Sequence, residues 1–184
     1  MSTRKHEAQK VGVFVDVQNM YYSAKNLYSA KVNFAEVLKA GVENRKLIRA
    51  FAYVIKADVG AEREFFDALT KIGFEVKEKD LQIFFGGAKK GDWDVGLCMD
   101  VIRMLPKIDA LVLVSGDGDY TELLRYAKGM GVRAEVIAFG KTASKHLVEE
   151  AEEMIDMAED PSKYLIRSSR AKRPPQKSTV NEKS

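Results

Sequence analysis

The stretch "LVLVSGDGDYTEL", residues 111–123, places an apolar segment directly before two carboxylates. Residues 111–114 form a continuous apolar run, which is typical of a buried β-strand. Asp117 and Asp119 follow with little between them and the strand. A turn explains either aspartate alone. Two acids at the end of a buried strand raise the question of whether other acids in the chain reach the same place.

The composition is that of an ordinary globular domain. The chain has 184 residues, of which 46% are hydrophobic and 31% are charged, enough for one well-packed core. The single cysteine, Cys98, excludes an internal disulfide and a multi-cysteine zinc site and fits a reducing compartment. No segment approaches the roughly 20 apolar residues of a membrane helix, and the N-terminus lacks signal-peptide character. We therefore expect a cytoplasmic protein with no membrane partner.

Short apolar strands alternate with amphipathic helices along the body of the chain. Strands are predicted at 11–16, 47–55, 74–79 (near an edge), 81–85, 110–115 and 132–139. Helices are predicted at 19–30, 34–43, 61–72, 95–105 and from Tyr120 to Met130, and residues 144–158 predict one or two more. This order predicts an α/β fold, a single three-layer domain with a mainly parallel central sheet flanked by helices.

The ends of the chain differ from its body. We expect a flexible N-terminus over residues 1–10, a folded domain over 11–158 and a basic, disordered tail over 159–184. From Arg167 onward six basic residues face one acid, so this end carries a net charge of +5. The tail either solubilises the protein or is vector-derived, or it binds a polyanion. Both interpretations stay open.

Two predicted strands end in acid, one at Asp16 and one at Asp117 and Asp119. Chemistry in parallel sheets lies beyond the carboxyl ends of the strands, so neighbouring strands would bring these carboxylates to one edge. Asp94 can join them from the first turn of the helix that leads into the strand at 111–115. Asp100 lies about 240° further around that helix and is a weaker candidate.

Each acid also has a purely structural explanation. Asp16, Asp92 or Asp119 can cap a helix, and Asp117 between glycines can belong to a turn. Carboxylates gathered together repel, however, so a crowded set requires a cation or a raised pKa. Oxygen ligands favour Mg²⁺ or Mn²⁺, whereas the two histidines lack the spacing of zinc ligands.

Three blocks of sequence together resemble a known family. They are "VFVDVQN", "KKGDWDVGLCMD" and "LVLVSGDGDYTELL", and in this order they resemble the NYN domain, in the LabA-like branch of the PIN-like nuclease superfamily. The resemblance covers about residues 10–158. It implies a PIN-like fold and a metal-dependent ribonuclease that hydrolyses RNA phosphodiester bonds.

The resemblance also implies roles for single residues. The acids of the catalytic and metal site would be Asp16, Asp94, Asp117 and Asp119. Asn19 matches a supporting amide, Ser115 matches a small hydroxyl residue before the acidic turn, and Asp100 matches a recurrent acid without a geometric argument of its own.

In the expected mechanism, Mg²⁺ or Mn²⁺ polarises the scissile phosphate and lowers the pKa of a water molecule that attacks it. Lys89 and Lys90, just before Asp94, could meet phosphates or could be solvated loop residues. Tyr21 and Tyr22 could stack on unpaired bases, although helix packing explains at least one of them.

Other functions remain to be weighed. A haloacid-type phosphatase requires a second acid where Gln18 stands, and a toprim-like site requires glutamate at the position of Asp16. The main alternative is a non-catalytic module that binds RNA or protein and retains a structural metal site. The expected partner is single-stranded RNA, and a homodimer is left open.

Overall fold

The computed structural model describes residues 5–56, 61–83, 89–90 and 92–167. The described strands are β1 (Lys10–Asp16), β2 (Lys31–Val32), β3 (Lys46–Lys56), β4 (Glu75–Asp80), β5 (Gln82–Ile83), β6 (Lys89–Lys90), β7 (Ala110–Val114), β8 (Arg133–Ala138), β9 (Glu153–Asp156) and β10 (Leu165–Ile166). The described helices are α1 (Val17–Tyr28), α2 (Phe34–Val42), α3 (Ala61–Ile72), α4 (Asp94–Met104), α5 (Thr121–Gly129), α6 (Lys145–Glu150) and α7 (Pro161–Tyr164), with 3₁₀ turns η1 (Leu105–Lys107) and η2 (Gly118–Tyr120).

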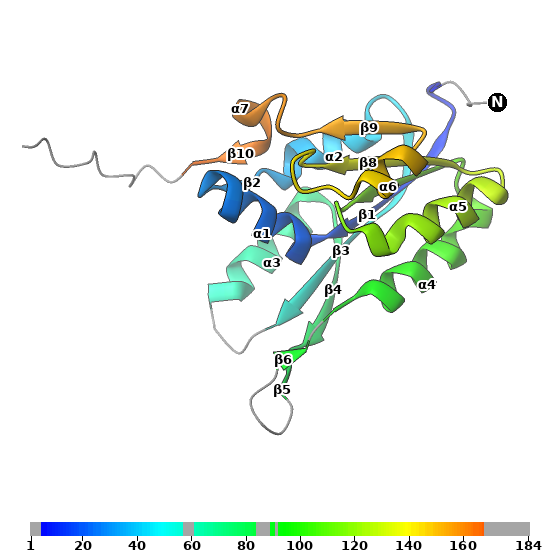
Figure 1. Ribbon diagram of the computed structural model, residues 1–184. Coiled ribbons are helices and arrows are strands. Elements are labelled where there is room, and N and C mark those ends of the chain that lie inside the picture. The colour runs from blue at the N-terminus through cyan, green and yellow to red at the C-terminus, as the bar shows by residue number, and fades with distance from the viewer. Residues whose placement is uncertain (1–4, 57–60, 84–88, 91, 168–184) are drawn as a thin grey trace, which may run out of the picture.

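Within the described residues, six strands form one sheet in the order β4-β3-β1-β7-β8-β9 (Figure 1). Every pairing in this sheet is parallel. The apolar side chains of β1 and β7 are fully buried at its centre, which explains why both strands are continuous apolar runs rather than alternating ones. The predicted α/β fold with a parallel central sheet is confirmed.

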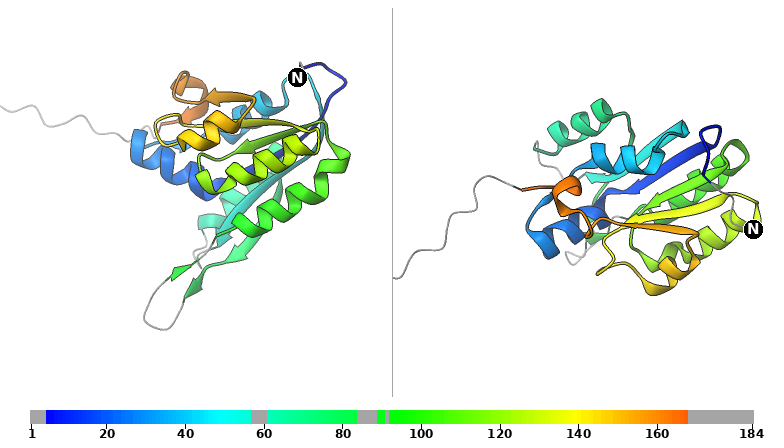
Figure 2. Two further views of the ribbon diagram at one scale, coloured as in Figure 1. Left: turned by 45° about the vertical axis from the view of Figure 1, so that its right-hand side comes forward. Right: turned by 90° about the horizontal axis from the view of Figure 1, so that it is seen from above.

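Helices cover both faces of this sheet (Figure 2). The helices α1, α2 and α3 lie on one face and α4, α5 and α6 on the other. From β1 the chain moves outward to β3 and β4, and then returns across the sheet to β7 before it continues to β8 and β9. The strand order therefore reverses between β1 and β7, and a crevice is expected beyond their carboxyl ends.

Local sequence signals set several helix ends as predicted. The side chain of Asn33 caps α2 by accepting a 3.4 Å hydrogen bond from the backbone N–H of Glu36. Gly73 follows α3 with a φ of +118°, a conformation that suits glycine. Pro106 lies in the 3₁₀ turn that ends α4. None of the helices in the described part of the chain has the length and apolarity needed to cross a bilayer.

The prediction for residues 144–158 was wrong in its second half. The helix α6 ends at Glu150, and β9 follows as an edge strand. Met154 and Ile155 pair with Val136 and Ile137 of β8. Pairing with the open edge of β8 outweighed a helical spacing that only a few apolar residues supported.

The structured part extends beyond the expected boundaries at both ends. Lys5, assigned to the flexible N-terminus, pairs with Glu153 at 2.6 Å and with Glu43 at 2.9 Å. Residues 161–166, assigned to the tail, form α7 and β10, and β10 pairs antiparallel with β2. Residues 168–184 lie outside the described part, so disorder of the tail remains a prediction.

A buried ionic cluster lies near the amino ends of the strands. Both oxygens of Glu135 accept hydrogen bonds from Arg45, at 2.7 and 2.8 Å, and Nε of Arg133 donates to Glu135 at 2.6 Å. All three side chains are almost completely buried. Since Arg45 precedes β3 and Arg133 begins β8, the cluster links distant strands at the edge opposite the predicted site.

We expect Glu135→Gln to lower the free energy of unfolding by about 3 kcal/mol or more, because it removes the carboxylate that neutralises the buried guanidinium group of Arg45. Urea denaturation measures this loss. The matched control is Glu75→Gln, which breaks a pair with Arg49 in which both side chains are nearly half exposed. That change should cost less than about 1 kcal/mol. Equal losses in the two variants would contradict a structural role for the buried cluster.

Candidate active site

Asp16 both caps a helix and faces the crevice. It is the last residue of β1, and its Oδ1 accepts a 3.0 Å hydrogen bond from the backbone N–H of Asn19, in the first turn of α1. The other oxygen, Oδ2, lies 3.4 Å from the hydroxyl of Tyr120. The cap and the site were alternatives in the sequence, but one carboxylate serves both because each contact uses a different oxygen.

The turn after β7 is held in place from two sides. The backbone N–H of Gly116 donates to Oδ1 of Asn19 at 3.0 Å, which ties the turn to α1. The fully buried hydroxyl of Ser115 accepts from the N–H of Asp117 at 3.2 Å, and Oδ1 of Asp117 accepts from the N–H of Asp119 at 3.0 Å. These contacts fix the backbone that presents Asp117.

Tyr120 brings two of the predicted acids together. Its hydroxyl lies 3.1 Å from Oδ1 of Asp94, the first residue of α4, as well as 3.4 Å from Asp16. The Tyr120 side chain is fully buried, and burial among carboxylates raises the pKa of its hydroxyl far above the usual value. The hydroxyl therefore keeps its single proton and donates it to this pair of acids.

A cleft of about 330 Å³ opens where these elements meet. Three of the four predicted metal-site acids, Asp16, Asp94 and Asp117, line it. The other lining residues are Gln18, Asn19, Tyr22, Ser23, Asn26, Tyr53, Ile55, Asp92, Trp93 and Thr142. The acids from the ends of β1 and β7 thus share one cleft at the point where the strand order reverses.

The acids in this cleft oppose one another's ionisation. Burial, together with the charges of Asp94 and Asp117, raises the pKa of Asp16 to about 6, although the hydrogen bond from Asn19 acts in the opposite direction. Burial also raises the pKa of Asp94, as do the neighbouring carboxylates, against the hydrogen bond from Tyr120. A cation in the cleft would relieve this repulsion.

The donor chemistry suits a hard divalent cation, although the side chains do not enclose one as they stand. Among the described residues, no three aspartate, glutamate, histidine or cysteine side chains are grouped so that they could hold a metal ion. The carboxylate oxygens of Asp16, Asp94 and Asp117 nevertheless face one cleft and repel one another. Such oxygens are the ligands that Mg²⁺ and Mn²⁺ prefer, so the donor set fits these ions.

Other predicted site residues lie at the margin of the cleft or outside the described part of the chain. Asp119 is exposed, yet its charge still raises the pKa of Asp94. Asp100 accepts a 3.1 Å hydrogen bond from the hydroxyl of Tyr53 and pairs with Arg103 at 3.2 Å, so it supports a residue of the cleft. Lys89 and Lys90 form β6, which pairs with β5, but their side chains lie outside the described part.

Sequence reasoning missed residues that line the cleft or contact its acids. Tyr120 was placed among the apolar positions of a helix, and no sequence pattern marks its hydroxyl. Asp92 was interpreted as a cap, but Trp93 occupies the capping position of α4 and Asp92 lines the cleft. Its place two residues before Asp94 was the available signal. Trp93 packs on Tyr53 with a 5.3 Å separation of ring centroids, and Nε1 of Trp93 donates to the carbonyl of Val54 at 2.8 Å.

Comparisons with known proteins identify the family of the chain and support its fold. A family model described as the NYN domain matches residues 10–159. The chain is 23% identical over 155 residues to the low amplitude and bright protein LabA of Synechococcus elongatus, covering 80% of this chain and 83% of LabA. It is also similar to a crystal structure of a protein of unknown function from Vibrio parahaemolyticus. That similarity has a TM-score of 0.80 and 28% identity, and it covers 89% of this chain and 100% of the other.

Replacing Asp16 by Asn tests the electrostatics of the cleft. The pKa of Asp16 in the folded protein, about 6, lies above the ordinary value of 3.8. Ionisation of Asp16 therefore opposes folding by an amount that grows as the pH rises from 3.8 and is fully present above pH 6. In chelator, Asp16→Asn should raise the free energy of unfolding at pH 7.5 by up to about 3 kcal/mol, and the gain should vanish as the pH falls to 4. Asparagine preserves the helix cap. Denaturant titrations at several pH values measure the effect.

The matched control is Asp160→Asn, which changes another helix-capping aspartate. The pKa of Asp160 is lowered by hydrogen bonds from Ser162 and Lys163, so its charge favours folding above the ordinary pKa and this contribution is lost in acid. This variant should be unchanged or slightly less stable at pH 7.5. A gain of the same sign and pH dependence in both variants would refute the repulsion assigned to the cleft.

Proposed function

The chain belongs to the NYN domain family, as its three motifs predicted, and on that premise we propose that it is a metal-dependent ribonuclease that hydrolyses phosphodiester bonds of single-stranded RNA. The observation that carries the proposal is the meeting of Asp16, Asp94 and Asp117 in one cleft, with Tyr120 between the first two. Crowded carboxylates at the end of a parallel sheet are an arrangement suited to phosphoryl chemistry with a divalent ion.

Nucleases of this family generally use divalent metals. In this chain Asp16, Asp94 and Asp117 would hold Mg²⁺ or Mn²⁺, with the exposed Asp119 at the margin. When bound, such an ion would neutralise charge on the scissile phosphate and acidify the attacking water. The raised pKa of Asp16 supports this assignment, because the group is poorly satisfied as a free carboxylate.

The remaining groups of the site hold these acids in place. Asn19 links α1 to the turn after β7 through Gly116, so the acids at the ends of the two strands keep their spacing. The hydroxyl of Tyr120 stays protonated and lies within hydrogen-bonding distance of both Asp16 and Asp94, which partly offsets their mutual repulsion. Contact of Lys89 and Lys90 with phosphate remains a prediction.

A non-catalytic module that binds RNA or protein is the alternative, and cleavage distinguishes it from a ribonuclease. The decisive experiment is digestion of end-labelled single-stranded RNA with Mn²⁺, with and without chelator. We expect cleavage by the wild-type protein that stops when chelator is added. Intact RNA in the presence of Mn²⁺ would refute the ribonuclease and favour the binding module.

Asp117→Asn should abolish this cleavage, because it removes a ligand charge from the cleft. Asparagine retains an oxygen that can accept the hydrogen bond from the N–H of Asp119, so the turn should keep its structure. Circular dichroism and thermal melting verify the fold, and gel analysis of labelled RNA measures the loss. Residual cleavage equal to that of the wild type and insensitive to chelator would identify a contaminating nuclease.

Tyr120→Phe removes the hydroxyl between Asp16 and Asp94 while it retains the buried ring. Loss of a group that orients metal ligands typically costs about 10- to 100-fold in metal affinity or activity. We expect a loss in that range, both in Mn²⁺ affinity measured by calorimetry and in RNA cleavage. The matched control is Tyr126→Phe, which changes an exposed tyrosine on α5 and should leave both quantities unchanged. Equal values for the wild type and Tyr120→Phe would exclude a positioning role for Tyr120.

A further inference from the structure

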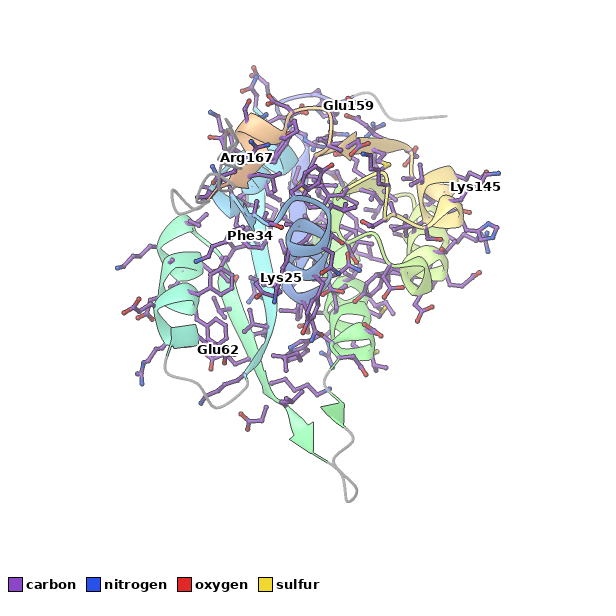
Figure 3. The ribbon with its side chains drawn as sticks, turned by 60° about the vertical axis from the view of Figure 1, so that its left-hand side comes forward. Lys25, Phe34, Glu62, Lys145, Glu159 and Arg167 are labelled. Atoms are coloured by element: carbon purple, nitrogen blue, oxygen red, sulfur yellow. The ribbon has the colours of Figure 1, made fainter. Side chains whose placement is uncertain are left out.

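A second hollow, the aromatic groove, adjoins the acidic cleft. It has a volume of about 380 Å³ and lies between α1, the end of β3 and α3. Gln18, Tyr22 and Ile55 line both hollows, so the aromatic groove continues directly from the acidic cleft. Figure 3 looks onto this side of the molecule, where Lys25 marks α1 and Glu62 marks the beginning of α3.

Three aromatic side chains in this groove are open to solvent. Tyr22 is 50% exposed, Tyr21 is 44% exposed and Phe65, on α3, is 37% exposed. The rings of Tyr21 and Tyr22 meet edge to face, with their centroids 5.3 Å apart. The sequence led us to expect that at least one of the two tyrosines packs within the protein. In the structure, about half of each side chain remains exposed to solvent.

The geometry of α1 explains this exposure. The helix buries Met20 and Ala24, four residues apart, against the sheet. Tyr21 and Tyr22 follow Met20 and turn toward the side of the helix that faces the groove. Nζ of Lys25, one turn beyond Tyr21, lies 5.5 Å from the centroid of the Tyr21 ring. The groove therefore combines flat apolar surfaces with a cation at its margin.

We propose that the aromatic groove binds an unpaired nucleobase of the RNA strand whose phosphate occupies the acidic cleft. The proposal rests on the proposed ribonuclease function and assigns a binding surface to one base of its single-stranded substrate. Bases stack on exposed aromatic rings in a manner that tolerates sequence, because every base has a flat face. Tyr22, which lines both hollows, places such a ring beside the acids, and Lys25 can meet the neighbouring phosphate.

A bound nucleotide would explain why an apolar groove opens onto an acidic cleft. A nucleotide has an apolar flat base and an anionic phosphate in one molecule, and the two hollows offer one surface for each. The amide of Gln18 lies at their junction and can both donate to and accept from a base edge. A base inside a duplex is stacked and paired, so it cannot enter the groove without leaving the helix.

The test compares RNA binding by variants of the full chain that also carry Asp117→Asn, so that the RNA stays intact. The probes are a fluorescent single-stranded oligoribonucleotide of roughly ten nucleotides, the same strand without bases, and the corresponding duplex. Fluorescence anisotropy in Mg²⁺ gives the dissociation constants. Tyr22→Leu should weaken binding of the single strand roughly tenfold and leave binding of the abasic strand unchanged.

Two control variants separate stacking from other effects. Tyr22→Phe retains the ring and should restore the affinity. Tyr126→Leu removes a tyrosine of α5 that is 48% exposed but lies outside the groove, and it should bind as the unsubstituted chain does. If Tyr22→Leu, Tyr21→Leu and Phe65→Leu all bind the single strand normally, the groove serves another partner, such as a protein, and the proposal is wrong. Equal losses for the abasic strand would also overturn it.

Binding and cleavage are measured independently, so the nucleobase subsite and the ribonuclease can fail separately. If the chain binds single strands through Tyr22 while the wild type fails to cleave them with Mn²⁺, the nucleobase subsite stands and the ribonuclease does not. If the wild type cleaves RNA and the aromatic variants bind normally, the ribonuclease stands and the subsite is refuted. A tighter complex with the duplex than with the single strand also overturns the subsite.

Discussion

The parallel pairing of β1 with β7 is the constraint on which the candidate site depends. Val15 of β1 lies opposite Val114 of β7, so the next residues of the two strands leave the sheet side by side. Both strands are buried at the centre of the sheet, where a shift of register would displace apolar side chains from the core. Hydrophobic packing therefore places Asp16, at the end of β1, beside the turn that follows β7.

Polar contacts then fix the positions of the segments that carry the acids. Asn19 accepts a hydrogen bond from the turn after β7 and donates its backbone N–H to Asp16. Tyr120 then reaches from η2 to Asp94 at the start of α4. Segments that are far apart in the sequence thus converge through two side chains, one an amide and one a phenol. Neither contact could form if β7 lay elsewhere in the sheet.

The sequence predicted the structure well at positions that only a few residue types can occupy. Buried strands that end in aspartate predicted the edge of the sheet at which Asp16 and Asp117 meet, and Asn33 and Gly73 marked helix ends. It was uninformative where tertiary contacts decide. The spacing of Met154 and Ile155 fits a helix as well as a strand, and only the free edge of β8 decides between them. The buried hydroxyl of Tyr120 looked like one more apolar helix position because its partners come from other segments.

The raised pKa of Asp16 separates the stability of the fold from the charge of the cleft. The fold depends on the parallel sheet and on the buried ionic cluster at its amino edge, whereas the acidic cleft at the carboxyl edge works against folding when no ion is present. The helix cap needs an oxygen at position 16 but not a charge, so a chain with asparagine there can keep the same fold. Architecture and charge are thus separable in this domain: the parallel sheet can persist in a chain whose cleft is neutral.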